Sequence, residues 1–585
     1  MSNHFDRRSF IKKSLFAAGG AAMITIPFVS CDNDEVETKN TENASRKNFN
    51  EGIASFDPTS SSVIIWTRYT TNFAGITELY WELSTDSNFT QIIRTGSIQT
   101  DESKDYTAAI DIQNLKSNLK LYYRFFNTAQ KEVSEIGETI TLPSAGDNVP
   151  QVKMAVCSCA NFAAGLFNVY EAMANSDVDV IVHLGDYIYE YGAGQYGTNA
   201  NTLALGRTHV PANEIITLQD YRARYKQYRR DAKLKLAHQK KPFIAVWDDH
   251  EIANDTYKDG AENHQLNEGS FSARKQSALK AYSEYIPLKT GANPKIYRSF
   301  EFGNLVALHM LDTRVIARDK QLDYANYFTA SGFNAAAFQT DLLNPSRKLL
   351  GNEQLSWLAN KVATSTQKWQ VLGQQVLMTK MLIPADLLLS MSAILAEIDA
   401  TGSARPQTLA AFQTTLTQLV TIKMRMLQND PTLTATEKAR INITLPYNLD
   451  AWDGYPIERE TLFAALAGKK VISLAGDTHN GWQGSLIEGF SGTKTQVGTE
   501  FATASVTSPG LETYLGIGAG ASAQIAQFQE AFALLIDDLH YADVSKRGYL
   551  KVTYTQGQAR ADWFYVTSTS TDSYSSNMEF TKIVN

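Results

Sequence analysis

The chain has few cysteines for its length: three in 585 residues. That number is too small for a secreted scaffold held together by disulfides. Basic residues are not in excess either. The formal net charge is −7, which argues against a protein that binds nucleic acid through its phosphates. Low-complexity repeats are missing as well. The content of 43% hydrophobic and 20% charged residues is that of an ordinary globular protein, long enough for two or more domains.

Long apolar runs are also scarce. The run at the N-terminus, about 15–29, is short for a membrane span. It follows the pair Arg7-Arg8 and stops at Cys31, an order typical of a twin-arginine export signal with a lipoprotein cleavage site. Residues 1–31 are therefore predicted to be a signal, with Cys31 as the lipidated residue. A buried helix in the same place is the competing interpretation, which the paired arginines and the small-residue stop disfavour.

Residues 32–49 form a polar tract with almost no large apolar side chains, and they are predicted to be a flexible tether. The signal and the tether together predict export through the twin-arginine route. The expected location is the periplasm or the cell surface, with the membrane as a partner through a lipid anchor. Nothing in the sequence predicts an oligomeric state.

Residues 50–147 are predicted to be an all-β domain. Short alternating segments, rich in β-branched and aromatic residues, are separated by turn residues; they are 62–70, 77–83, 91–99, 105–112 and 120–126. Regular short strands at this spacing predict a small sandwich of immunoglobulin or fibronectin type. The region contains no obvious chemistry and is expected to act in packing.

Residues 150–570 alternate between strand and helix patterns, which predicts a layered α/β domain. The expected helices are 167–174, 218–236, 269–285, 352–364 and 460–466, and further strands are expected at 307–311, 370–372, 549–554 and 562–566. Residues 383–443 have apolar residues at helical spacing. They are predicted to be an insertion of two or three helices over the core, serving as a lid.

Polar residues follow four apolar runs of this domain in a fixed order. The segments are AVCSCAN (155–161), VHLGDYIYE (182–190), VWDDHEIAN (246–254) and VISLAGDTHN (471–480). Each run is typical of a buried parallel strand, and ligands in open α/β sheets bind beyond the carboxyl ends of such strands. The strand ends are thus predicted to form a metal cluster from Cys159, Asp186, Tyr189, Asp249, His250, Asn254, Asp477 and His479.

The residue types indicate which metals the cluster holds. A thiolate and a phenolate favour a trivalent or borderline-soft ion over Mg²⁺, so Cys159 and Tyr189 predict Fe³⁺. The oxygen ligands of Asp249 and Asn254 suit a hard ion such as Ca²⁺. Asp186 is the best candidate for a bridging carboxylate. His250 is the candidate catalytic residue, contacting the phosphate or protonating the leaving alkoxide.

These motifs resemble the PhoD-type alkaline phosphatase and phosphodiesterase family, within the calcineurin-like metallophosphoesterases. The resemblance covers nearly the whole chain. It is carried by the opening of the β region at 51–59 and 63–68, by Tyr122-Tyr-Arg-Phe125, and by five site motifs in family order. These are Cys159, Gly185–Glu190, Asp248–Glu251, Asp312-Thr-Arg314 and Gly476–His479. Phe56 departs from the family, where a Gly is typical. The resemblance implies a metallophosphoesterase α/β sandwich and a site containing Fe³⁺.

The predicted activity is hydrolysis of phosphate esters, monoesters or diesters, by a metal-bound hydroxide. Arg314 is predicted to contact the substrate, with a structural salt bridge between Asp312 and Arg314 as the alternative. Gln375 lies where related phosphatases place a ligating His and is a weak ligand candidate. Two other functions stay open: a phospholipase D-type phosphodiesterase acting on lipid or teichoic-acid-like polymers, and a non-enzymatic surface lipoprotein.

Overall fold

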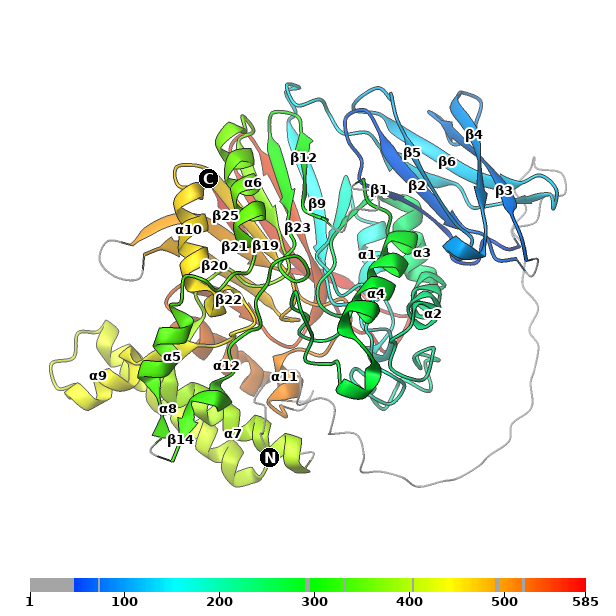
Figure 1. Ribbon diagram of the computed structural model, residues 1–585. Coiled ribbons are helices and arrows are strands. Elements are labelled where there is room, and N and C mark those ends of the chain that lie inside the picture. Colours follow the sequence, from blue (N-terminus) through cyan, green and yellow to red (C-terminus); the bar gives the residue numbers. More distant parts are fainter. Residues whose placement is uncertain are drawn as a thin grey trace, which may run out of the picture.

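Two large β-sheets form the centre of the protein (Figure 1). The computed structural model describes residues 47–71, 74–289, 295–330, 332–401, 404–489, 494–517 and 521–585. The first sheet has nine strands, in the order β25 (Ser576–Val584), β24 (Ala559–Val566), β23 (Arg547–Thr555), β9 (Gln151–Cys157), β10 (Val180–His183), β11 (Phe243–Ala245), β1 (Ile53–Phe56), β2 (Val63–Arg68) and β5 (Thr107–Ile112).

The second sheet has seven strands. Their order is β12 (Arg298–Phe302), β13 (Val306–Met310), β16 (Trp369–Gly373), β19 (Lys470–Ala475), β21 (Thr495–Ala502), β20 (Gly481–Glu488) and β22 (Leu539–Asp543). Strands β9, β10 and β11 are mutually parallel, and so are β13, β16, β19 and β21. The carboxyl ends of the parallel strands therefore lie together in each sheet. The polar residues of the four motifs come directly after these strand ends.

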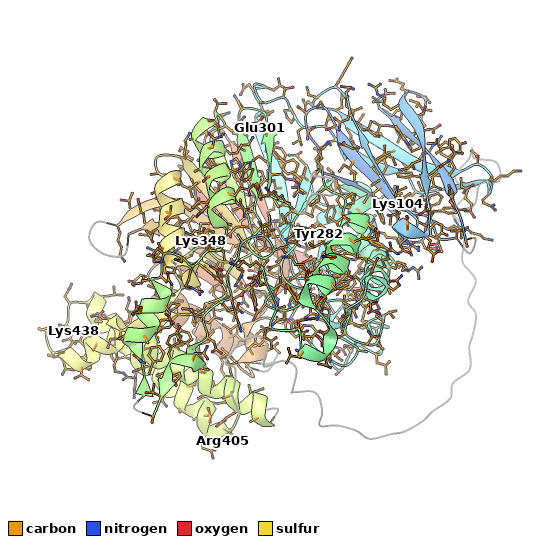
Figure 2. All side chains as sticks on the ribbon, viewed as in Figure 1. Lys104, Tyr282, Glu301, Lys348, Arg405 and Lys438 are labelled. Carbon is orange, nitrogen blue, oxygen red and sulfur yellow. The ribbon has the colours of Figure 1, made fainter. Side chains whose placement is uncertain are left out.

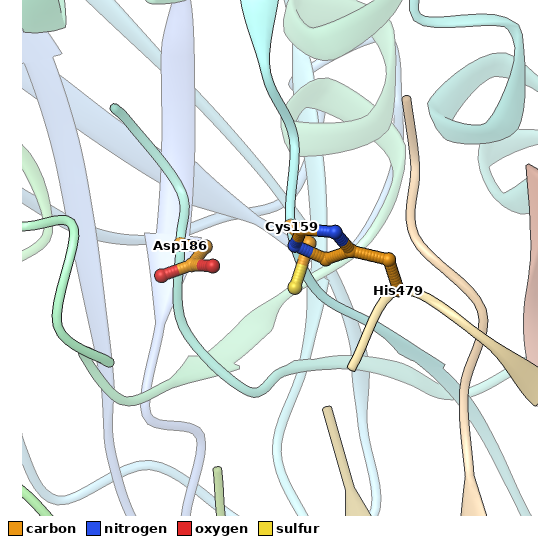
Figure 3. Close-up of side chains that lie close together, drawn as sticks. All are labelled: Cys159, Asp186 and His479. Carbon is orange, nitrogen blue, oxygen red and sulfur yellow. The ribbon is translucent and has the colours of Figure 1, made fainter. Parts of the chain in front are cut away.

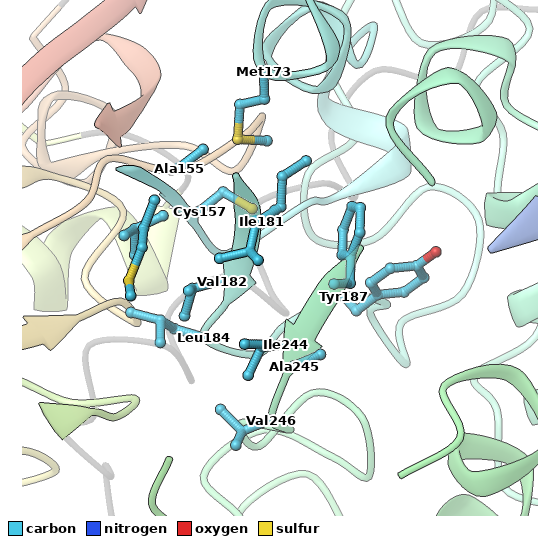
Figure 4. Close-up of a cluster of buried hydrophobic side chains, with 14 of the residues drawn as sticks. Ala155, Cys157, Met173, Ile181, Val182, Leu184, Tyr187, Ile244, Ala245 and Val246 are labelled. Atoms are coloured by element: carbon cyan, nitrogen blue, oxygen red, sulfur yellow. The ribbon is translucent and has the colours of Figure 1, made fainter. Parts of the chain in front are cut away.

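The two sheets pack face to face around one core. Side chains of β9, β10 and β11 meet those of β13, β16 and β19 in this cluster, and Val182, Ile244, Leu308 and Ile472 are all 3% exposed or less. Figure 4 shows the part of the core beneath the site. Burial of each such side chain stabilises the fold by about 1.5–3 kcal/mol. This dense layer gives the strand ends a rigid base.

Helices cover the outer faces of the sheets. The helices against the first sheet are α1 (Asn168–Ala174), α2 (Leu218–Arg229), α3 (Ala232–Lys240) and α4 (Phe271–Tyr285); those nearer the second are α6 (Gly351–Thr364), α10 (Pro456–Leu466), α11 (Leu511–Tyr514) and α12 (Ser522–Leu535). Helix α5 (Ala335–Leu342) follows the short strands β14 (Phe328–Thr329) and β15 (Gly332–Phe333). No helix within these described ranges combines the length and apolar character of a membrane span.

The helix predicted over 218–236 is two helices, and Asp231 is the reason. Its side chain accepts hydrogen bonds from the backbone N–H of Lys233 (2.9 Å) and Leu234 (3.1 Å), which makes it the N-cap of α3. Such a cap ends one helix and starts the next.

The N-terminal all-β region is present, and its strands form two layers around a core of their own. Its immunoglobulin or fibronectin type stays a prediction. Strands β3 (Thr77–Ser84), β4 (Ile92–Thr100), β6 (Lys120–Asn127), β7 (Glu132–Val133) and β8 (Gly137–Ile140) form a sheet of their own. Strands β1, β2 and β5 form the other layer and also extend the nine-stranded sheet, because β1 pairs in parallel with β11. The side chain of Arg298 fixes this junction with two hydrogen bonds of 2.7 Å to the buried carboxylate of Asp57.

The predicted insertion is a group of three helices on a short two-stranded base. Strands β17 (Leu382–Pro384) and β18 (Thr444–Pro446) pair at its two ends, and α7 (Ala385–Thr401), α8 (Pro406–Leu427) and α9 (Ala435–Asn442) lie between them. Helix α8 contacts α12, and their apolar side chains share a second core. Arg405 and Lys438 project from its outer side (Figure 2). Its action as a lid stays a prediction.

Candidate metal centre

The four polar motifs converge at the ends of β9, β10, β11 and β19. All the predicted ligands are buried, with exposed fractions of 3% or less. Cys159, Asp186, Asp477 and His479 have φ values of 61°, 54°, 63° and 64°. Residues with a Cβ rarely adopt this left-handed backbone, and such strain is often found at functional sites. The chain thus turns sharply after three of the four strands, just where the predicted ligands lie.

One group of donors contains a thiol, a carboxylate, an imidazole and a phenol. The ligand atoms of Cys159, Asp186 and His479 lie within 4.8 Å of one another, and Figure 3 shows the three side chains close together. The hydroxyl of Tyr189 joins them, donating to Asp186 Oδ2 at 3.0 Å and lying 3.3 Å from His479 Nε2. The structure therefore brings Cys159 and Tyr189 to the same place, as the Fe³⁺ prediction requires.

Neighbouring groups orient two of these donors. The carbonyl of Pro509 lies 2.7 Å from His479 Nδ1 and can only accept, so Nδ1 carries the hydrogen and Nε2 faces the cluster with its lone pair. Ser508 donates to the Tyr189 hydroxyl at 2.7 Å. Burial, followed by the charges of Asp186 and Cys159, raises the pKa of Tyr189 well above its ordinary value. Ionisation of this phenol therefore needs a cation beside it.

Asp186 also belongs to a second group of donors. The ligand atoms of Asp186, Asp249 and His250 lie within 4.8 Å of one another, and so do those of Asp248, Asp249 and Asp477. Asp186 and Asp249 each take part in two groups, so the donors form a continuous series. Asp477 and His479, which were predicted to face one cluster together, lie in different groups of this series.

Asn254 lies beside the partner of His250. Its backbone N–H donates to Glu190 Oε1 at 2.9 Å, and its side-chain Nδ2 donates to Glu262 at 3.1 Å. Its Oδ1 is buried and has no hydrogen-bond partner within the described part of the chain. An orphaned buried acceptor is rare in proteins, and a cation would satisfy it.

His250 is held by Glu190, which the sequence analysis did not select as a site residue. Oε2 of Glu190 lies 2.6 Å from Nδ1 of His250. Burial alone lowers the pKa of His250, but the charges of Asp249, Glu190 and Asp186 outweigh it and raise the pKa to about 9. The raised pKa favours the protonated imidazole at neutral pH in the metal-free chain.

Arg314 is buried among carboxylates. Its Nε donates to Asp248 at 2.5 Å, Nη1 to Asp450 at 2.9 Å and Nη2 to Asp477 at 3.0 Å. The guanidinium thus makes structural salt bridges, but with these three carboxylates; Asp312, the predicted partner, accepts from the backbone N–H of Arg314. Contact with a substrate remains a prediction. Gln375 is also engaged: Oε1 accepts from Thr313, and Nε2 donates to the carbonyls of Trp247 and Leu311. No atom of that amide is left as a natural metal ligand.

The side chains at the strand ends are chemically suited to bind a cluster of metal ions. Several carboxylates are buried close together, and burial of like charges is unfavourable unless cations compensate them. Cys159, Tyr189 and His479 bring a thiol, a phenol and an imidazole to one donor group. Asp248, Asp249 and Asp477 bring carboxylate oxygens to another. The free oxygen of Asn254 points to the same conclusion.

Sequence reasoning missed several residues around the cluster. Glu190 is the last residue of the 182–190 motif, but its role depends on a contact with His250 at the next strand end. Ser508, Pro509 and Tyr196 lie on loops without periodicity, and the Tyr196 hydroxyl is 3.3 Å from His479 Nδ1. Tyr196 follows the 182–190 motif closely in the chain, whereas Ser508 and Pro509 are far from every motif and have no sequence signal. Cys31, the predicted lipidation site, lies outside the described residues.

Comparisons with known proteins identify the family that the chain resembles. The family model for PhoD-like phosphatase matches residues 154–563, and the model for the PhoD-like phosphatase N-terminal domain matches residues 35–143. Alkaline phosphatase D of Bacillus subtilis (strain 168) is 32% identical over 579 residues, covering 96% of this chain and 84% of that protein. The solved structure of PhoD has a TM-score of 0.71 and 29% identity, covering 93% of this chain and 91% of that one.

The resemblance inferred from the motifs is thus confirmed, and so is the mixed α/β fold with an all-β region in front of it. The non-enzymatic alternative is excluded with them. The chain belongs to the PhoD-like phosphatase family and is a hydrolase of phosphoric esters.

Proposed function

We propose that this chain hydrolyses phosphate monoesters and diesters outside the cytoplasm, at a mixed cluster of Fe³⁺ and Ca²⁺. The observation that carries the proposal is the shared position of Asp186. Its carboxylate belongs both to the donor group of Cys159 and His479 and to the group of Asp249 and His250. A carboxylate common to two donor groups is what a bridged pair of ions requires.

Cys159, Tyr189, Asp186 and His479 would hold Fe³⁺, because thiolate, phenolate and imidazole donors suit a ferric ion. Asp249, Asn254 and Asp477 would hold Ca²⁺, which prefers carboxylate and carbonyl oxygens. When bound, such ions neutralise the charge on the phosphate oxygens and lower the pKa of the attacking water. The protein contributes the rigid placement of the donors at the strand ends.

His250 would move the proton. Glu190 holds its Nδ1 at 2.6 Å, so the proton on Nε2 can go to the departing alkoxide oxygen. Although burial opposes ionisation, the charge of His250 and its hydrogen bond hold the pKa of Glu190 below its ordinary value. Glu190 therefore stays a carboxylate and stabilises the imidazolium until the proton leaves.

The test is a metal analysis of the purified protein combined with a panel of esters. We expect iron and calcium together, with activity on p-nitrophenyl phosphate, bis-p-nitrophenyl phosphate or both. A monoester preference supports the phosphatase function, whereas a strong preference for phosphatidylcholine or a teichoic-acid polymer supports the phospholipase D-type alternative. Full activity in protein that contains neither metal would contradict the proposed cluster.

A further inference from the structure

Glu251 joins two of the strand ends that carry predicted ligands. Its carboxylate is 1% exposed and accepts three backbone hydrogen bonds. Oε2 accepts from the N–H of Asp186 (3.1 Å) and of Asp248 (2.8 Å), and Oε1 accepts from the N–H of Tyr187 (2.6 Å). One side chain therefore connects the turn after β10 with the turn after β11.

The two turns are also in direct contact. Gly185 has a φ of 103°, and a Cβ there would lie 2.4 Å from both the backbone N and the Cβ of Asp248. Asp186 beside it has a left-handed backbone. Such a conformation persists only where the surroundings hold it. Three hydrogen bonds from backbone amides to the oxygens of one buried side chain are directional, so Glu251 is placed to hold it.

We propose that Glu251 is a positioning residue that sets the separation of Asp186 from Asp249 and His250. The inference rests on the proposed function, in which Asp186 and Asp249 bind neighbouring ions. Glu251 itself contacts backbone atoms of the turns, so it acts through the ligands. Replacement of one carboxylate oxygen by an amide nitrogen removes at least one of the three hydrogen bonds and sets an N–H group against a backbone N–H. The turns then loosen, and the ligand oxygens no longer meet at the spacing that a pair of neighbouring ions needs.

Glu458 offers a matched control within the same chain. It is also a glutamate with 1% exposure that accepts three backbone hydrogen bonds, from Leu349, Leu350 and Gly351. None of these three residues is a predicted ligand. Glu251→Gln and Glu458→Gln thus remove equivalent hydrogen bonds, and only the former acts on the strand ends of the site.

The experiment measures thermal stability, metal content and kinetics of both variants and of Glu251→Asp. Calcium affinity is measured by titrating Ca²⁺ into EGTA-treated protein. We expect both Gln variants to melt at lower temperature. Only Glu251→Gln should lose calcium affinity and kcat, each by roughly 10–100-fold, with KM for p-nitrophenyl phosphate within about threefold of wild type.

Glu251→Asp keeps the charge but is one methylene shorter, so it cannot reach both turns and should show a smaller loss of the same kind. If Glu251→Gln does not fold, the measurements on Glu251→Asp test the proposal in its place. Wild-type calcium affinity and kcat in the Glu251 variants that fold, or equal losses in Glu458→Gln, would overturn the proposal. Wild-type protein that binds no metal would instead contradict the proposed function, so the two failures are distinguishable.

Discussion

The carboxylate of Glu190 holds the imidazole of His250, with Oε2 of the glutamate 2.6 Å from Nδ1 of the histidine. The two residues come from different strand ends, β10 and β11, and both are buried. The contact fixes the ring and directs Nε2 away from the glutamate. A histidine oriented by a carboxylate in this way is suited to proton transfer at its other nitrogen.

The first prediction concerns this pair. His250→Ala should lower kcat by roughly 10²–10⁴, the usual range for a general acid, while iron and calcium contents stay nearly unchanged. Glu190→Gln should lower kcat by roughly 10–100-fold, because it removes the charge that stabilises the imidazolium. The loss in His250→Ala should be larger for an alkyl phosphate than for p-nitrophenyl phosphate, since an alkoxide needs the proton more.

His309→Ala is the control, because that buried histidine bonds Ser299 and Gln370 in the second sheet, away from the predicted ligands. It should keep its kcat. Full activity of His250→Ala, or equal losses for both leaving groups, would remove the proton-transfer role.

The second prediction concerns colour. If Cys159 and Tyr189 bind Fe³⁺, charge transfer from the thiolate and phenolate should give the purified protein a visible absorption band. Cys159→Ser and Tyr189→Phe should each shift or bleach the band. Cys157→Ser should not, because Cys157 is buried in the core beneath the site. EGTA should remove calcium and activity while most of the colour remains. A colourless, active protein containing only zinc or magnesium would refute the metal assignment.

The strand ends of the site could be predicted from the sequence because two local signals coincide there. An apolar run predicts a buried strand, and the polar residues after it must lie at the carboxyl end. Residues such as Ser508 and Pro509 could not be predicted in this way. They are far from Tyr189 and His479 in the chain, and loops have no periodicity that would place them.

The sequence likewise predicted most strands and helices of the fold, but not how the strands divide between the sheets. Alternation identified the strands of the N-terminal region, but it does not tell which sheet a strand joins. That choice depends on contacts such as the one between Asp57 and Arg298, which are 241 positions apart in the chain. Likewise, apolar residues at helical spacing continue across Asp231, so only the observed cap separates α2 from α3.

The third prediction concerns Arg314. Arg314→Lys should lower the free energy of unfolding by about 1–3 kcal/mol, because an ammonium cannot replace a guanidinium that bonds Asp248, Asp450 and Asp477. It should also reduce calcium content. Arg298→Lys, which disturbs the buried pair with Asp57, should lose comparable stability and keep its metals. A variant of Arg314 with wild-type metal content and a raised KM would instead support direct contact with the substrate.

The fourth prediction concerns export. Replacement of Arg7 and Arg8 by Lys should leave full-length precursor in the cytoplasm, because the twin-arginine route reads that pair. Cys31→Ala should leave export intact but release or misprocess the protein, since no lipid can be attached. Fractionation and immunoblotting of the cells measure both. Normal export of the Arg7→Lys, Arg8→Lys variant would show that another signal is used.

The fifth prediction tests the contact between the turns after β10 and β11. Gly185→Ala should place a Cβ 2.4 Å from the backbone N of Asp248, which forces the turns apart. Gly194→Ala is the control: Gly194 also has a positive φ, of 80°, but a Cβ there meets nothing within 4 Å. Both variants carry the strain of an alanine at positive φ, so the difference between them isolates the clash.

We expect Gly185→Ala to lose about 1–3 kcal/mol more unfolding free energy than Gly194→Ala, measured by urea denaturation. It should also lose calcium and phosphatase activity together, whereas Gly194→Ala keeps both. Equal stability and full metal content in the two variants would mean that the turns can separate without moving the ligands.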